Sequence, residues 1–245
     1  MNESYKKFDF LLKIVYDSCM KNSKGVLRMA FSEKLFDENF TFSFKTMVAS
    51  NINIATKAFD LFWEKNAIFL SGANELYGRI LGYAVNQQFK NSALSTASEF
   101  LVSDKEVNTY KTKAVFLNTR DYITSIGRTE KPLKLPCKAA YKLKLAQGNK
   151  QDNAQIEMFV DEGNEKIFGP PKKYAFIGYR YINGELKHLN IIVPDEGFNG
   201  IIYSSDLTNH MRESYKYLPE EIIEENITSL KEHIVSEAKK QKLIK

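Results

Sequence analysis

The sequence is poor in the residues that cross-link small proteins or bind metals. Its 245 residues include only two cysteines, Cys19 and Cys137, and three histidines. Neither set has the spacing of a zinc site or of a redox pair. A chain of this length can bury enough surface to fold without disulfides or metals. We therefore expect two reduced cysteines and no cofactor.

Long apolar runs are also missing from the sequence. Charged residues such as Lys6, Lys7 and Asp9 follow Met1 closely, unlike the apolar core of a signal peptide. No uncharged apolar stretch approaches the roughly 20 residues that a membrane-spanning helix needs. We therefore expect a cytoplasmic protein with no membrane partner.

The common sequence motifs of enzymes are absent as well. The sequence contains no nucleophile elbow G-x-S-x-G, no Walker phosphate-binding loop and no G-x-G-x-x-G fingerprint. His188, His210 and His233 lie far apart along the chain, without metal-ligand spacing. These absences favour a binding protein over an enzyme.

One arrangement resembles a nuclease signature. Glu185 and Lys187 form an E-x-K triplet, and Asp161 follows an earlier candidate strand. Side chains two residues apart on a strand share a face. Two carboxylates could hold Mg²⁺ there while the lysine activates a water. A metal-dependent nuclease is therefore an alternative function, and the competing interpretation is a pair of solvent-facing charges beside a turn.

Apolar spacing predicts a mainly helical region over residues 1–112. Apolar residues recur every three or four positions in Tyr5–Met20, Ile52–Phe62 and Leu76–Phe89, which is the period of a helix with one buried face. The four phenylalanines of residues 36–44 alternate partly with polar residues. A short strand, a core-plugging loop and a helix all remain open for that run.

Residues 113–205 are predicted to form an antiparallel β-rich region. The clearest signal is a long hairpin at about residues 174–193, where Asn183-Gly184 supplies the two left-handed residues of a type I′ turn. Pro194 is expected to close it. A second hairpin is expected around the turn-like run Asn118–Asp121.

Two more strands and a terminal helix complete the predicted elements. Alternating lysines predict a strand at Tyr141–Leu145, and Gln155–Val160 is a further candidate. In residues 206–245, Pro219 suits a first helical turn, and Glu220 with its acidic neighbours suits the positive end of the helix dipole. The expected fold class is α+β, with the C-terminal helix packing on the rest, and the three regions can pack as one compact domain.

Positive charge is concentrated in the middle of the chain. The protein carries a net charge of +5, but residues 105–144 alone hold ten basic and three acidic side chains, a net charge of +7. Such a segment attracts a polyanion, because neutralised phosphates release counterions. The alternative interpretation is a solvated lysine-rich strand face that discourages edge-to-edge aggregation.

A run that overlaps this segment resembles a helix-turn-helix. In Ser95–Lys111, Ser103 and Glu106 match a capping box, which predicts a second helix starting there. With Leu76–Phe89 before it and a hairpin near Arg120 after it, the order resembles a winged helix. That resemblance implies that the second helix enters the major groove and that the hairpin touches the neighbouring backbone.

We therefore expect a non-enzymatic binding protein that contacts nucleic acid, with duplex DNA as the first choice of partner and the type of nucleic acid left open. The candidate nucleic-acid-binding residues are Lys105, Asn108, Lys111, Lys113, Arg120, Arg128, Lys131 and Lys134. The first alternative is an adaptor or inhibitor in phage and host conflict, whose basic segment would bind an acidic protein partner.

Overall fold

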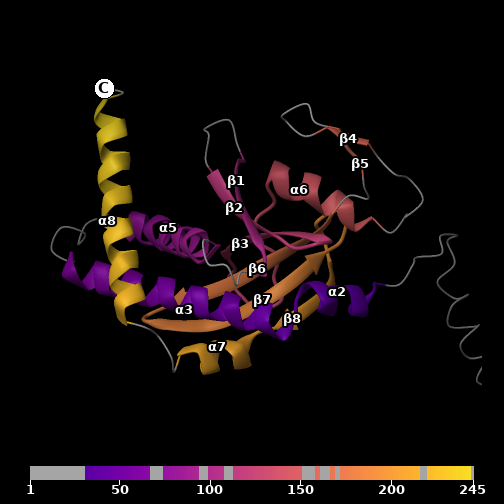
Figure 1. Ribbon diagram of the computed structural model, residues 1–245, viewed down its shortest axis with the longest axis horizontal. Coiled ribbons are helices and arrows are strands. Elements are labelled where there is room, and N and C mark those ends of the chain that lie inside the picture. Colours follow the sequence, from indigo (N-terminus) through magenta and orange to yellow (C-terminus); the bar gives the residue numbers. More distant parts are fainter. Residues whose placement is uncertain are drawn as a thin grey trace, which may run out of the picture. The chain divides into compact units, whose positions relative to one another are not determined.

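The computed structural model describes residues 31–66, 74–93, 99–107, 113–150, 158–160, 166–168, 172–215 and 220–243 (Figure 1). All of them belong to one compact unit, Phe31–Lys245. The predicted helix at Tyr5–Met20 lies outside the described residues.

The described residues form helices around a mixed sheet, which confirms the α+β fold class. The helices are α2 (Glu33–Asn39), α3 (Phe42–Lys65), α5 (Asn74–Ala93), α6 (Ala140–Ala146), α7 (Thr208–Tyr215) and α8 (Glu220–Leu243). The strands of the main sheet are β1 (Leu101–Glu106), β2 (Lys113–Asn118), β3 (Tyr122–Arg128), β6 (Lys173–Ile182), β7 (Glu185–Pro194) and β8 (Ile201–Asp206).

The main sheet has the strand order β1-β2-β3-β6-β7-β8. Its neighbouring strands pair antiparallel, as the sequence predicts, except that β3 and β6 run parallel. Parallel neighbours cannot be joined by a tight turn, because the chain must return to the starting end of the sheet. The connection from β3 to β6 therefore crosses one face of the sheet, and it contains α6 (Figure 1).

Both predicted hairpins are confirmed. β6 and β7 meet at Asn183 and Gly184, whose φ angles are 53° and 78°, as a type I′ turn requires. β2 and β3 pair on either side of the turn at Thr119–Asp121. Pro194 ends β7, opposite Ile201 of β8. Turn chemistry is local, so the sequence alone was sufficient to place both turns.

One face of the sheet is covered by α2, α3 and α5. Apolar residues of β6 such as Ala175 and Ile177 share a core with these helices. The phenylalanine-rich run that the sequence left open forms the junction of α2 and α3. Thr41 caps α3 by accepting a hydrogen bond from Phe44 N at 3.0 Å, so a loop residue separates two helices there.

The alternate residues of β6 face the other way. Tyr174 and Phe176 pack with Ala146 and Phe198 in a second core beneath α6. The predicted strand at Tyr141–Leu145 is wrong, because this segment lies within α6. Alanine, leucine and lysine all favour a helix, and that propensity outweighs the short alternation of lysines.

The predicted second helix of the helix-turn-helix is also wrong. Leu101–Glu106 is a strand that pairs antiparallel with β2, with Ser103 opposite Phe116. The Ser103 hydroxyl accepts a hydrogen bond from Asn118 Nδ2 at 2.9 Å, so it bridges two strands instead of capping a helix. The winged-helix resemblance fails with that helix, and residues 108–112 lie outside the described residues.

Two shorter elements complete the comparison with the sequence. β4 (Met158–Val160) pairs with β5 (Lys166–Phe168) in a separate small sheet, which confirms the end of the predicted strand at Gln155–Val160. The rest of that strand lies outside the described residues. α7 was not predicted, and α8 confirms the C-terminal helix.

Alanine substitutions at two glycines test how closely the connection between β3 and β6 packs. Gly148 lies in that connection, and Gly82 of α5 is the control. A Cβ on Gly148 would lie 2.4 Å from the carbonyl oxygen of Lys172, whereas one on Gly82 of α5 would meet nothing within 4 Å. We expect Gly148→Ala to lower the free energy of unfolding by about 1–3 kcal/mol through overpacking. Gly82→Ala should raise it by about 1 kcal/mol, because alanine favours a helix. Urea denaturation of both variants measures this, and equal effects would contradict the packing described.

Candidate nucleic-acid interface

The segment Thr129–Lys150, here called the basic strap, crosses the sheet between β3 and β6. It contains six lysines and a single acidic residue, Glu130, so its net charge is +5. The strap comprises a loop, α6 and a short 3₁₀ turn at Gln147–Asn149. The net charge of the strap thus equals that of the whole protein.

The start of the strap is fixed to the sheet by Thr129. Its backbone N–H donates to Tyr179 O at 2.9 Å, and its hydroxyl lies 2.8 Å from Nε2 of His188 on β7. Both side chains are buried. Gly178 leaves the space for this contact, because a Cβ there would lie 3.0 Å from the Thr129 methyl group. The strap therefore begins at a defined point above β6 and β7.

The end of the strap is fixed by Asn149, which is buried. Its Nδ2 donates to Tyr174 O at 2.9 Å and to Pro194 O at 2.8 Å, while Oδ1 accepts from Tyr174 N at 2.8 Å. One side chain thus satisfies backbone groups at the start of β6 and at the end of β7. A buried backbone group left without a partner costs about 1–3 kcal/mol, so these bonds hold the strap firmly.

The middle of the strap turns its apolar side chains toward the sheet. Leu135, Leu143 and Leu145 pack against the second core. Lys142 is half-buried, with its ammonium 5.3 Å from the centre of the Phe176 ring. Burial lowers the pKa of Lys142, but the ring face favours the cation. The inner side of α6 is therefore occupied by packing, and its outer side remains available.

The other lysines of the strap are exposed to solvent. They are Lys131, Lys134, Lys138, Lys144 and Lys150. Lys134 forms an ion pair with Glu130, and Lys138 donates to the Asn199 side chain. The backbone carbonyl of Lys172 lies beside Gly148 at the end of the strap, whereas the Lys172 ammonium donates to Thr119 O at 2.6 Å in the turn between β2 and β3. The strap therefore presents five exposed lysines on a segment that is attached to the sheet at both ends.

Few acidic groups oppose these lysines among the residues that the structure describes. Glu130 is paired within the strap, and Lys134 lowers the pKa of its carboxyl. Arg180 of β6 adds a further cation, and it donates to the Glu130 carbonyl. In the neighbouring loop, Asp195 accepts a hydrogen bond from Asn199 N at 2.7 Å, and Glu196 is exposed. Within the described ranges, positive charge therefore dominates the surface of the strap.

The residues predicted from the sequence are distributed over both faces. Lys131 and Lys134 lie in the strap, and Lys105 faces the same side, opposite Ala114 of β2. Lys113 lies opposite Glu106 on the other face. Arg128 also faces away from the strap, because a Cβ on Gly78 of α5 would lie 2.3 Å from its guanidinium.

Arg120 lies in the turn between β2 and β3, at the end of the strands away from Lys131. Its guanidinium contacts Asp121 at 2.9 Å and Glu38 of α2 at 3.3 Å. Burial alone would raise the pKa of Asp121, but hydrogen bonds from Asn39 and Arg120 lower it. Arg120 therefore connects the turn to α2. Asn108 and Lys111 lie outside the described residues.

The candidate residues that the sequence missed are Lys138, Lys144, Lys150 and Lys172. Lys138 and Lys144 belong to the basic segment, but the strand predicted at Tyr141–Leu145 gave no reason to place Lys144 beside Lys131. A helical interpretation of Ala140–Ala146 would have placed Lys144 on the solvent side of the leucines. Lys172 precedes β6, and only the fold brings it next to the strap.

The residues of the nuclease alternative are not assembled in the described structure. Glu185 and Lys187 are exposed and form an ion pair with each other beside the hairpin turn. Asp161 lies outside the described residues. Within the ranges given above, no group of three or more His, Cys, Asp or Glu side chains is placed to hold a metal ion.

Comparisons with protein-family models, with curated proteins and with solved structures find no match to this chain. None of the helices in the described part of the chain is long and apolar enough to cross a bilayer. Any function assigned to this surface therefore depends on the charge and geometry of the strap itself.

The anchor at His188 predicts a loss of stability in mild acid. Burial, and then the charge of Arg180, lower the pKa of His188 below its ordinary value of 6.5. Because the unfolded chain takes up this proton more readily, the stability from neutral His188 is present above about pH 6.5 and is lost as the pH falls further. Urea denaturation from about pH 7 to 5 should show this decline, and His188→Gln should reduce it.

A pH titration of the histidine ring signals by nuclear magnetic resonance checks the cause. His188 should titrate with a midpoint below the ordinary histidine value. A midpoint at or above that value would contradict the buried, neutral role of His188 in the anchor.

Proposed function

We propose that this protein binds nucleic acid through the phosphate backbone, with the basic strap as the contact surface. The observation that carries the proposal is the set of exposed lysines on a segment whose two ends are fixed to the sheet by Thr129 and Asn149. Because the backbone of this segment is already ordered, binding does not have to order it, and each neutralised phosphate releases counterions.

The chemistry of the strap favours binding that does not depend on sequence. Lysine ammonium groups act as point charges toward phosphates, whereas reading of base edges relies on planar groups in a groove. The predicted recognition helix would have started near Ser103, but Leu101–Glu106 is strand β1. This segment therefore gives no support to the reading of base edges by a helix. Contacts to phosphates fix position on the nucleic acid and carry no sequence information.

Duplex DNA is the partner that fits this surface best. Proteins that bind single strands rely on exposed aromatic rings for base stacking. The one aromatic residue of the strap, Tyr141, is turned toward Phe116 of β2, with the ring centres 5.9 Å apart. The outer side of the strap offers charge without stacking platforms, which suits a regular phosphate backbone.

Binding of a labelled DNA duplex, followed by fluorescence anisotropy at several salt concentrations, tests the proposal. The strap variant is Lys131→Ala, Lys138→Ala and Lys144→Ala combined. Log K falls with log salt, and each lost phosphate contact should make that slope shallower by about 1. The magnitude of the slope should therefore be smaller by about 2 to 3 in the strap variant. Its affinity in low salt should fall by at least about tenfold.

The matched control removes three exposed lysines from elsewhere, in Lys34→Ala, Lys65→Ala and Lys231→Ala. It carries the same change in net charge and should keep the slope of the unmodified protein. Equal losses in both variants would show attraction to net charge alone and would contradict an interface at the strap. Copurification of a defined acidic polypeptide without nucleic acid would assign the strap to a protein partner instead.

A further inference from the structure

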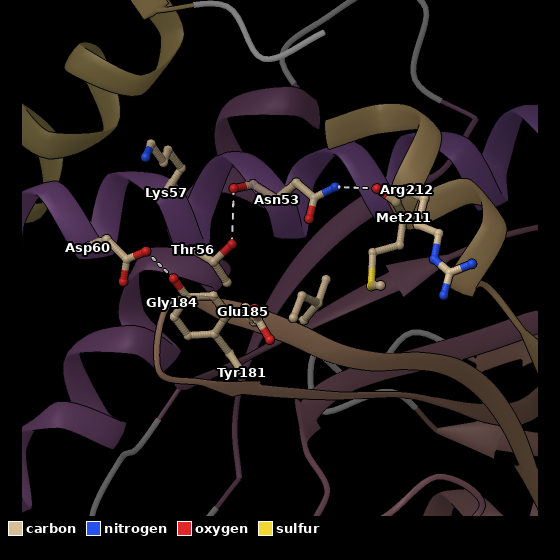
Figure 2. Close-up of a pocket in the computed structure, with 10 residues that line it drawn as sticks. Asn53, Thr56, Lys57, Asp60, Tyr181, Gly184, Glu185, Met211 and Arg212 are labelled. Carbon is tan, nitrogen blue, oxygen red and sulfur yellow. Dashed lines mark hydrogen bonds between the residues drawn. The ribbon is translucent and has the colours of Figure 1, made fainter. Parts of the chain in front are cut away.

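A cleft of about 420 Å³ lies on the other side of the sheet from the strap (Figure 2). It is formed by α3, α7 and the hairpin of β6 and β7. Its walls include the apolar parts of Tyr181, Leu186 and Met211, which belong to or pack against the core under α3. The size and the apolar walls are those of a site for a small molecule.

Asn53 presents a hydrogen-bond acceptor to this cleft. The residue is only 1% exposed, and its Nδ2 donates to Met211 O and to Ser214 Oγ, both at 2.8 Å. The carbonyl of Met211 can only accept, so the orientation of the amide is fixed. Oδ1 of Asn53 points into the cleft and has no hydrogen-bond partner among the described residues (Figure 2).

Asp60 extends the acceptors along the same side of α3. Asn53, Thr56 and Asp60 follow each other at intervals of three and four residues, so they form one row on the helix. Tyr181 donates its hydroxyl hydrogen to Oδ2 of Asp60. Burial raises the pKa of Asp60, although this hydrogen bond opposes the shift. The row offers oxygen atoms to a ligand that carries hydroxyl groups.

Arg212 of α7 lies at the other end of the cleft from Asp60 (Figure 2). Its side chain is exposed and makes no ion pair with any residue that the structure describes. Glu185 also lines the cleft, but Lys187 already neutralises it. The cleft therefore combines a row of acceptors at one end with an uncompensated cation at the other.

We propose that this cleft binds a small hydroxylated anion of the sugar phosphate class, with hydroxyl groups at acceptors of the row that ends at Asp60 and with its phosphate toward Arg212. A guanidinium matches the geometry of a phosphate group. A carboxylate and an amide oxygen accept from hydroxyl groups. The ring of Tyr181 and the side chain of Leu186 cover the apolar side of the ligand.

Binding at the cleft is independent of binding at the strap. Tyr181 and Leu186 pack in the core under α3, whereas the strap covers the core under α6. The two surfaces thus lie on opposite faces of one sheet. A variant in the cleft should leave the DNA affinity of the strap unchanged, which separates a failure of this proposal from a failure of the proposed function.

Isothermal titration with ribose 5-phosphate tests the proposal, with ribose and inorganic phosphate as separate arms. We expect saturable binding of ribose 5-phosphate and weaker binding of each half. Arg212→Ala should lower the affinity for ribose 5-phosphate by at least about tenfold, because it removes a charged partner of the phosphate. The affinity for ribose should stay unchanged. Asp60→Asn, which keeps the size of the side chain, should lower the affinities for ribose and for ribose 5-phosphate by similar factors.

Arg79→Ala and Asp37→Asn are the matched controls, since both residues are exposed and lie outside the cleft. They should leave binding unchanged within about twofold. The absence of saturable binding of ribose 5-phosphate would overturn the proposal. Equal binding by the unmodified protein, Arg212→Ala and Asp60→Asn would also overturn it, because the ligand would then occupy another surface.

Discussion

The parallel pairing of β3 with β6 determines where the rest of the chain between them must lie. Parallel neighbours need a long crossover, and the chain from Thr129 to Asn149 accordingly returns across one face of the sheet to the start of β6. That face is apolar at Tyr174 and Phe176, and it requires a cover. Only the inner side of the cover must be apolar, so its outer side is free to carry charge.

The strap follows from this constraint. Leu135, Leu143 and Leu145 face the sheet, the ends of the strap are held by Thr129 and Asn149, and its exposed lysines face solvent. The opposite face is covered by α2, α3 and α5, and a cleft lies there beside α7. The sheet thus separates the two surfaces for which we propose binding, the strap for a polyanion and the cleft for a small molecule.

Features that depend on neighbouring residues could be predicted from the sequence. The turn at Asn183-Gly184 and the periodic helices α3, α5 and α8 are of this kind, as is the concentration of charge in residues 105–144. Features that depend on distant pairing could not. Lys105 and Lys113 lie on opposite faces because the register of β1 with β2 sets their directions. The capping-box pattern at Ser103 matched a local rule that the pairing of β1 with β2 overrode, whereas in α6 the helix propensity outweighed the short alternation of lysines.

Protection of lysines from chemical acetylation, measured by mass spectrometry with and without duplex DNA, tests the central claim most directly. The account predicts that DNA protects Lys131, Lys138 and Lys144 and leaves Lys34 and Lys231 as reactive as in the free protein. Protection that is confined to Lys34 and Lys231, or that is equal at all five lysines, would contradict the assignment of the strap as the nucleic-acid interface.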